Sequence, residues 1–214
     1  MASRKYRRVF SLGLLAMVLV LALSACTKPE TQAPPVSGGD PVTGEPKQGG
    51  TLIVAFGVPV TSLDPGYAVG TQGQVVRKTI MESLVYRDEE GNYLPQLAER
   101  WETDPDGLTW RFYLRKGVKF HDGTDFTAEA VRRSIMRMID PEKGLPRGAD
   151  IKFIDSVDVV DDHTVEIKTK QPVGPFLAYV AMDTMSILSP ASLDQWNNDI
   201  GWHPVGTGPF KFES

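Results

Sequence analysis

The stretch LPQLAERWETDPDGLTWRFYLRKGVKFHDGTDFTAEAV, residues 94–131, decides the fold. Within it, apolar and polar residues alternate from Leu108 to Leu114. Successive side chains of a strand point to opposite faces, so this alternation predicts a strand with one buried face. Ala98 to Glu102 precedes that strand across an Asp106-Gly107 turn signal. The two segments together predict a β-hairpin.

The second half of the stretch predicts a turn followed by a helix. Val118 to Phe120 is a further short strand, and HDGTDF at 121–126 is a turn-rich segment. Thr127 can cap the helix that follows, since a threonine oxygen can accept from the free N–H groups of the first turn. We expect the helix to end at Ile139, because Asp140-Pro141 follows.

A second hairpin is predicted farther along the chain. Val157 to Val160 and Thr164 to Lys168 are β-branched runs on either side of the turn Asp161-Asp162-His163. Pro175 then stands where it can open a short helix from Phe176 to Val180.

The last residues form a loop, Gly206 to Pro209, and a strand start, Phe210 to Phe212. A domain rarely stops in the middle of a strand. We therefore expect the sequence to be the N-terminal part of a longer protein.

Three features precede the long stretch. TLIVAF at 51–56 is a short, β-branched run of the kind that makes a buried strand. The segment 58–73 is rich in turn residues, with Leu63-Asp64-Pro65-Gly66 as its clearest signal. After it, six residues recur at helical spacing and predict one amphipathic helix: Val75, Val76, Thr79, Ile80, Ser83 and Leu84.

The first fifty residues predict export rather than a folded domain. Four basic residues precede an apolar run from Val9 to Leu23, which is the layout of a secretory signal. Leu-Ser-Ala directly precedes Cys26, the sole cysteine, and resembles the lipobox of bacterial lipoproteins. We therefore expect residues 1–25 to be removed, Cys26 to be lipidated, and the Pro/Gly-rich segment 26–50 to be a flexible tether. An ordinary signal peptide with a stray cysteine is the alternative.

Charge and motifs exclude several classes of function. Removal of residues 1–25, which carry four basic and no acidic residues, takes the formal net charge from −4 to −8, so nucleic acid is not an expected partner. Gly70-Thr71-Gln72-Gly73 lacks the Lys-Ser/Thr of a phosphate-binding loop, and no nucleophile elbow is present. His121, His163 and His203 lie about forty residues apart, without the spacing of a metal-binding pair. The sequence predicts neither an enzyme nor a cofactor or metal site.

The order of these motifs resembles the bacterial extracellular solute-binding proteins of family 5, which deliver peptides and nickel complexes to ABC importers. The segments that carry the resemblance are Leu63-Asp64-Pro65, the long stretch 94–131, DDHTVEIKTKQPVGPFLAYVAMD (161–183) and PVGTGPFKF (204–212). It implies an α/β, two-lobed fold of the periplasmic-binding-protein class (class II type), of which only the N-terminal part of the first lobe is present. The implied parts are a first strand and loop of that lobe (51–66), an inserted β-rich subdomain (67–189) and a return to the lobe (190–214).

The resemblance also implies which residues face a ligand. Loop positions after Leu-Asp-Pro are expected to do so: Tyr67, Ala68 and Gly70. So are those after the short helix: Met182, Asp183, Thr184 and Met185. For Tyr67 a surface role in the turn is the alternative, and for the two methionines it is core packing. Trp110 and its neighbours are expected to be scaffold.

We expect the whole protein to capture short peptides outside the cytoplasm and to deliver them to an ABC permease with its ATPases. It would be a monomer, held to the membrane through Cys26 and facing the periplasm or the cell exterior. A receptor for a nickel complex or another small solute, and a peptide-sensing lipoprotein without transport, remain alternatives. An exported enzyme built on the same lobe is a further alternative, although no catalytic signature supports it.

Overall fold

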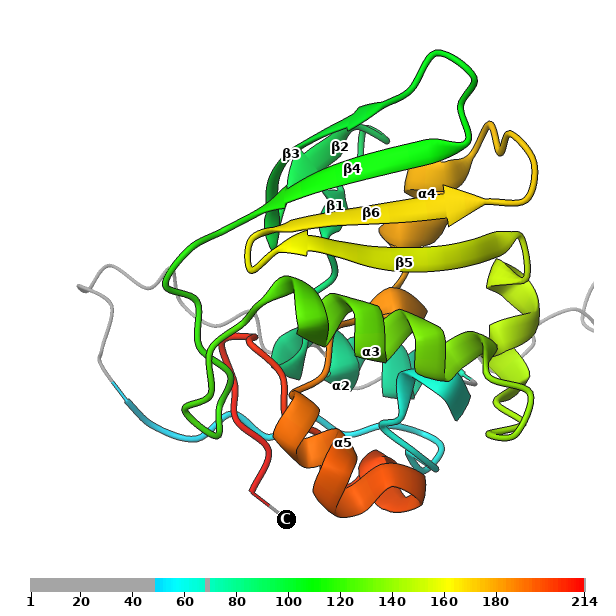
Figure 1. Cartoon of the computed structure of the whole chain (residues 1–214). Coiled ribbons are helices and arrows are strands. Elements are labelled where there is room, and N and C mark those ends of the chain that lie inside the picture. Colours follow the sequence, from blue (N-terminus) through cyan, green and yellow to red (C-terminus); the bar gives the residue numbers. More distant parts are fainter. Residues whose placement is uncertain (1–48, 68–69, 214) are drawn as a thin grey trace, which may run out of the picture. The chain divides into compact units, whose positions relative to one another are not determined.

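Two antiparallel hairpins pair side by side into one four-stranded sheet (Figure 1). In the computed structural model, which describes residues 49–67 and 70–213, the strand order is β3-β4-β6-β5. The strands are β3 (Ala98–Thr103), β4 (Thr109–Leu114), β5 (Ile154–Asp161) and β6 (Thr164–Thr169). Phe112 pairs with Val165 between the two central strands, and both side chains are fully buried. Both predicted hairpins are confirmed.

Two helices cover the sheet and complete its core. The predicted helix after Thr127 is α3 (Ala128–Ile139), whose Val131 and Ile135 are buried against the sheet. The predicted short helix is α4 (Phe176–Val180). The Phe176 ring stacks on Trp110 with ring centres 4.6 Å apart, so this helix closes the core beside the strand that the alternation predicted.

A layer of short helices lies below α3 in Figure 1. It contains α2 (Thr71–Ile80) and α5 (Pro190–Trp196), with the short segments η1 (Pro65–Tyr67) and η4 (Asn197–Trp202). Two further short segments, η2 (Pro146–Ile151) and η3 (Asp183–Met185), bury Ile151 and Met185 in the main core. A second, smaller core holds this layer together; its buried members are Leu63, Ile80, Met81, Leu188, Leu193 and Ile200. Within the described residues, η1 of this layer also contacts η3.

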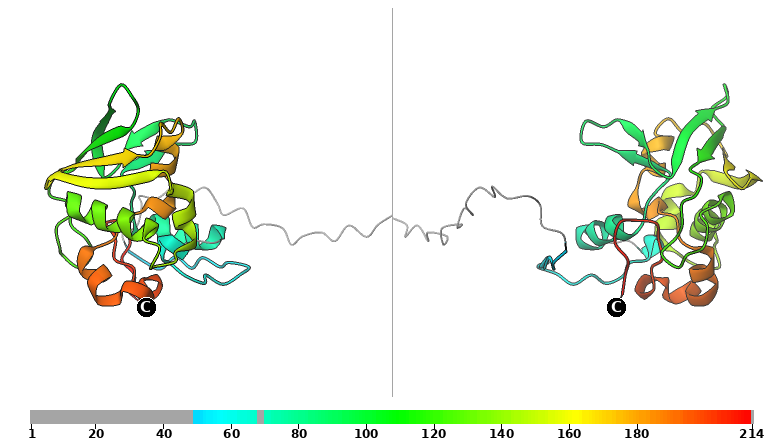
Figure 2. Two further views of the ribbon diagram at one scale, coloured as in Figure 1. Left: turned by 45° about the vertical axis from the view of Figure 1, so that its right-hand side comes forward. Right: turned by 90° about the vertical axis from the view of Figure 1, so that its left-hand side faces the viewer.

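A small two-stranded hairpin stands apart from the main sheet. It consists of β1 (Val85–Arg87) and β2 (Tyr93–Pro95), and no pattern in the sequence predicted it. The right-hand view of Figure 2 shows it projecting from the sheet on the same side as α2. Its turn is fixed by Asp88, whose carboxylate accepts hydrogen bonds from the backbone N–H and the side-chain amide of Asn92.

Three predicted strands are wrong. Residues 51–56 form no strand, and Leu52 and Ile53 are each 87% exposed. Val118 to Phe120 contributes only one isolated bridge, and Phe210 to Phe212 is irregular. A strand exists through backbone pairing, which an apolar run cannot supply alone, and none of the described ladders includes these segments.

The predicted helix after Gly73 is correct in type but not in its limits. It ends at Ile80, because the backbone of Met81 is already extended, so Ser83 and Leu84 lie beyond it. Its buried face holds Arg77, whereas Val75 is 47% exposed.

The predicted signal segment, Cys26 and residues 27–48 of the tether lie outside the described residues. Across residues 49–67 and 70–213, the structure contains no helix long and apolar enough to span a bilayer.

Candidate ligand site at the meeting of η1, α2 and η3

A buried ion pair joins α2 to η3. Arg77 donates from Nε and Nη2 to Oδ2 of Asp183, at 2.9 and 2.5 Å, and the two side chains are 1% and 7% exposed. Gln74, one turn earlier on α2, donates from its side-chain amide to the other carboxylate oxygen at 3.1 Å. The charge of Asp183 is therefore neutralised and its oxygens are engaged within the protein.

A second buried ion pair joins the turn before η1 to α3. Arg137 donates to both carboxylate oxygens of Asp64, at 3.1 and 2.6 Å. Asp64 also accepts from the backbone N–H of Gly66 at 2.7 Å, which closes the turn on itself. Two-point pairing of this kind fixes orientation as well as distance. The Leu-Asp-Pro turn is thus held rigidly against α3.

Two predicted ligand-facing residues of the first loop, Tyr67 and Gly70, lie at the surface. Tyr67 is 44% exposed and borders a hollow of about 290 Å³ that also includes Lys143 and Leu145. Gly70 is exposed at the start of α2 with φ +86°, a backbone conformation that favours glycine. Ala68 lies outside the described residues.

The second group of predicted residues is mostly interior. Met182 is half-buried and lines a hollow, but Asp183 and Thr184 are buried, and Met185 packs in the main core. The structure brings η1 and η3 against each other, so the two predicted loops do meet. A direct ligand contact by any of these residues stays a prediction.

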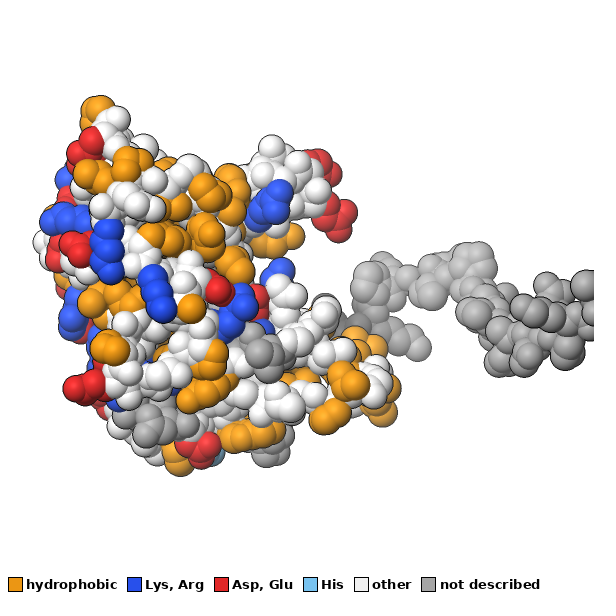
Figure 3. Space-filling view, turned by 90° about the vertical axis from the view of Figure 1, so that its right-hand side faces the viewer, with side chains coloured by type: hydrophobic (Ala, Val, Ile, Leu, Met, Phe, Trp, Pro, Cys, Tyr) orange, Lys and Arg blue, Asp and Glu red, His pale blue; other side chains and the backbone are white. Residues whose placement is uncertain are grey.

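One hollow of about 330 Å³ is lined by the segment around η3 and by the projecting hairpin, and we name it the hairpin hollow. Its walls come from α2, from β1 with the turn after it, and from the chain around η3, and include Gln74, Lys78, Tyr86, Arg87, Asp88, Met182 and Asp183. Figure 3 shows the face that is hollowed beneath a projecting part of the molecule, with basic side chains near the hollow. Its volume lies within the range of ligand sites for small molecules.

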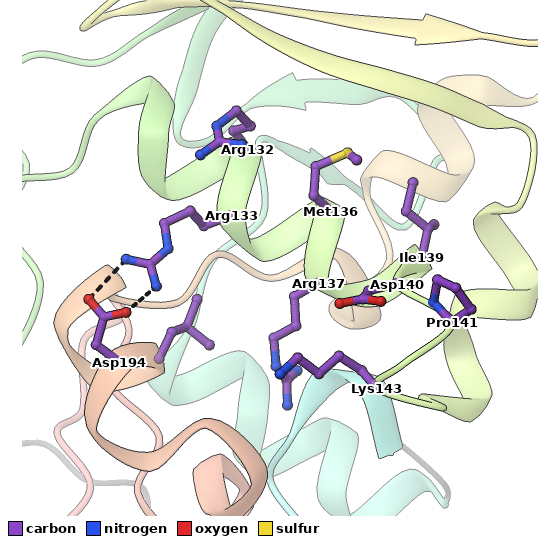
Figure 4. A pocket seen from close by; sticks show the side chains of 10 residues that line it. Arg132, Arg133, Met136, Arg137, Ile139, Asp140, Pro141, Lys143 and Asp194 are labelled. Atoms are coloured by element: carbon purple, nitrogen blue, oxygen red, sulfur yellow. Dashed lines mark hydrogen bonds and ion pairs between the residues drawn. The ribbon is translucent and has the colours of Figure 1, made fainter.

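A larger hollow of about 630 Å³ lies between α3 and α5 (Figure 4). None of the predicted ligand-facing residues lines it. Three of its four cations are already paired: Arg133 with both oxygens of Asp194, Arg132 with Glu129 and Arg137 with Asp64. The hydrogen bond from Arg133 holds the pKa of Asp194 below its ordinary value. Among the described residues, Lys143 is the one cation of this hollow without an ion pair, and the hollow also contains the carboxylate of Asp140.

The histidines take structural places. The ring of His121 contacts the carbonyl oxygen of Gly208 at 2.7 Å through Nε2, and His203 stacks on Trp196 with ring centres 3.6 Å apart. The backbone N–H of His163 donates to Asp161 in the hairpin turn. Within residues 49–67 and 70–213, no group of three metal-ligating side chains comes together.

Comparison with known proteins identifies relatives over most of this chain. A family model described as "Bacterial extracellular solute-binding proteins, family 5 Middle" matches residues 92–214. The glutathione-binding protein GsiB of Escherichia coli O157:H7 is 39% identical over 163 residues, which is 76% of this chain and 32% of that protein.

Solved structures agree with these relatives. The periplasmic binding protein DppA of Helicobacter pylori, in complex with the peptide STSA, matches with TM-score 0.64 and 33% identity over 72% of this chain and 35% of its own. NikZ of Campylobacter jejuni, in complex with Ni(L-His), matches with TM-score 0.66 and 27% identity over 73% of this chain and 31% of its own.

The fold is therefore that of part of a periplasmic binding protein, in agreement with the expected fold class. The chain belongs to the bacterial extracellular solute-binding proteins of family 5. It spans about a third of the length of the relatives it matches.

Proposed function

We propose that the whole protein captures short peptides outside the cytoplasm and delivers them to the permease of an ABC importer. The observation that carries this proposal is the hairpin hollow, because α2, the projecting hairpin and the segment around η3 border one concave surface on a rigid scaffold. The relatives support a peptide as the ligand: GsiB is named for glutathione, and DppA was solved with a tetrapeptide.

In this proposal the chain supplies one wall of the site. Two buried ion pairs hold that wall in shape before ligand arrives, which lowers the conformational cost of binding. In a whole protein as long as the relatives, the residues outside this chain would supply the opposing wall. Closure of the two walls would exclude water from the ligand.

The remaining parts of the proposal follow from the sequence. Cys26 is the lipidated residue that holds a monomeric receptor at the membrane, and the segment 26–50 is the tether. The protein has no enzymatic activity of its own; its partners are the ligand, the permease and its ATPases.

Calorimetric titration of the full-length protein tests the proposal directly. Three probes separate the candidates: glutathione, the peptide Ser-Thr-Ser-Ala, and nickel with L-histidine. We expect at least one peptide to bind at micromolar concentration and the nickel complex to bind more weakly. Binding of the nickel complex alone would support the alternative that NikZ represents.

A further inference from the structure

Two cationic side chains line the hairpin hollow without an ion-pair partner among the described residues. Lys78 lies on α2 and Arg87 on β1, so the two come from different walls. Both side chains are exposed. In the part of the chain that the structure describes, neither forms an ion pair.

The two anions that line the hollow are, in contrast, already engaged. Asp183 is neutralised by Arg77 and also bonded to Gln74. Asp88 accepts from Asn92 at 2.6 and 2.9 Å, and the hydrogen bond from the Asn92 side chain lowers the pKa of Asp88. Because Arg77 neutralises Asp183, the charges that remain in the hollow are those of Lys78, Arg87 and Asp88, two positive and one negative.

The position of Arg87 is set by the shape of the hairpin. Its guanidinium Nη2 lies 3.3 Å from where a Cβ would stand on Gly91, in a turn where Gly91 has φ +89°. The missing Cβ leaves space for the guanidinium beside the turn. Arg87 therefore belongs to a hairpin whose turn geometry is fixed by hydrogen bonds between Asp88 and Asn92.

We infer that the hairpin hollow binds a carboxylate group of the ligand between Lys78 and Arg87. This inference rests on the proposed function and adds to it the chemical class of the ligand. The ligand would be a peptide whose free carboxylate is bound in the hairpin hollow. Arginine and lysine are the side chains that recognise carboxylates, arginine in two-point geometry. The apolar part of the lining, which includes Met81, Tyr86 and Met182, would contact the carbon atoms beside that group.

The inference can be tested with a charge-matched pair of double variants in the full-length protein. The hollow variant carries Lys78→Gln with Arg87→Gln, and the control carries Lys116→Gln with Lys152→Gln, two exposed lysines outside the hollow. Each variant is titrated with glutathione, with Ser-Thr-Ser-Ala, and with the C-terminal amide of Ser-Thr-Ser-Ala. In parallel, the melting temperature is measured with and without glutarate at low ionic strength.

We expect the hollow variant to bind the free-acid peptides at least tenfold more weakly than the wild type, while the control variant does not change. Affinity for the amide should be equal in all three proteins. If the hollow variant keeps the preference for free acid over amide, the inference is wrong and the proposed function stands.

Failure of the proposed function gives a different result, namely that no peptide binds to the wild type. The glutarate measurement then decides the inference alone. A melting temperature raised by glutarate in the wild type and the control, but not in the hollow variant, supports an anion site for another ligand. An equal response in all three proteins overturns it.

Discussion

The guanidinium of Arg77 donates two hydrogen bonds to a single carboxylate oxygen of Asp183, across 106 positions of sequence. Both side chains are almost fully buried. The pair therefore joins α2 to η3, two of the segments that line the hairpin hollow.

Removal of one partner should destabilise the protein strongly. Asp183→Asn leaves Arg77 as an uncompensated buried charge, and we expect a loss of about 3–5 kcal/mol in the free energy of unfolding. The control is Asp194→Asn, which removes an ion pair whose carboxylate is 67% exposed and should cost far less, because solvent screens exposed pairs. Denaturant unfolding measures both, and equal losses would contradict the assignment of Arg77 as fully desolvated.

Trp110 should act as scaffold rather than as a ligand contact. Its ring stacks on Phe176 at 4.6 Å over the core, so Trp110→Ala should cost about 3 kcal/mol. The melting temperature should fall while the peptide affinity of the folded protein stays unchanged. Trp202, 51% exposed, offers the matched control, with a small effect expected for Trp202→Ala. Normal stability with lost affinity would move Trp110 into the site.

Gly206 should tolerate no side chain. A Cβ on this residue would lie 2.3 Å from the carbonyl oxygen of Ile80 at the end of α2, so Gly206→Ala must displace backbone. We expect a clear fall in melting temperature. Gly174→Ala is the control, since nothing lies within 4 Å of its Cβ position and its φ is not positive. Similar melting temperatures for the two variants would show that the loop moves freely.

Asp122 should contribute stability that depends on pH. Burial alone would raise the pKa of Asp122, but hydrogen bonds from Ser189 and Thr124 hold it below its ordinary value. A carboxyl group with a lowered pKa in the folded state stabilises above its unfolded pKa, about 4, and loses that contribution as the pH falls through the folded value. The difference in melting temperature between wild type and Asp122→Asn should therefore be present at pH 7 and shrink as the pH falls below about 4. A difference that stays constant would show that Asp122 acts only through shape.

Cys26→Ser should release the protein from the membrane, because the thioether to lipid needs the cysteine sulfur. Fractionation of cells that express the full-length protein measures this. A variant that remains in the membrane fraction at the wild-type level would refute lipid anchoring at Cys26.

Local patterns predicted the two hairpins of the sheet, α3 and α4, because alternation, turn residues and proline placement act within a few residues of sequence. They missed the β1–β2 hairpin, whose strands have three residues each and carry little periodicity. They also missed the buried pairing of Arg77. An arginine on a helix face is ordinarily exposed, and only its partner, Asp183, 106 positions away, makes burial tolerable.

The candidate site was predictable only in part, for the same reason. Resemblance to a family pointed to Tyr67 and Met182, which border hollows. The basic residues Lys78 and Arg87 carry no local signal, because single exposed cations on a helix and on a strand are common. Their significance depends on the fold that places them around one hollow.

The order of strands in the sheet also bears on how the protein acquires its structure. Each outer strand pairs with a neighbour close in sequence, but the central ladder joins β4 to β6, with Arg111 and Glu166 separated by 55 positions. Contacts between distant residues form slowly, because the intervening chain must first be closed into a loop. We therefore expect the two hairpins to appear early and independently. The slow step would be the docking of β4 on β6. It requires α3 and the segment that follows it, which connect the two hairpins in sequence, to fold back onto the sheet.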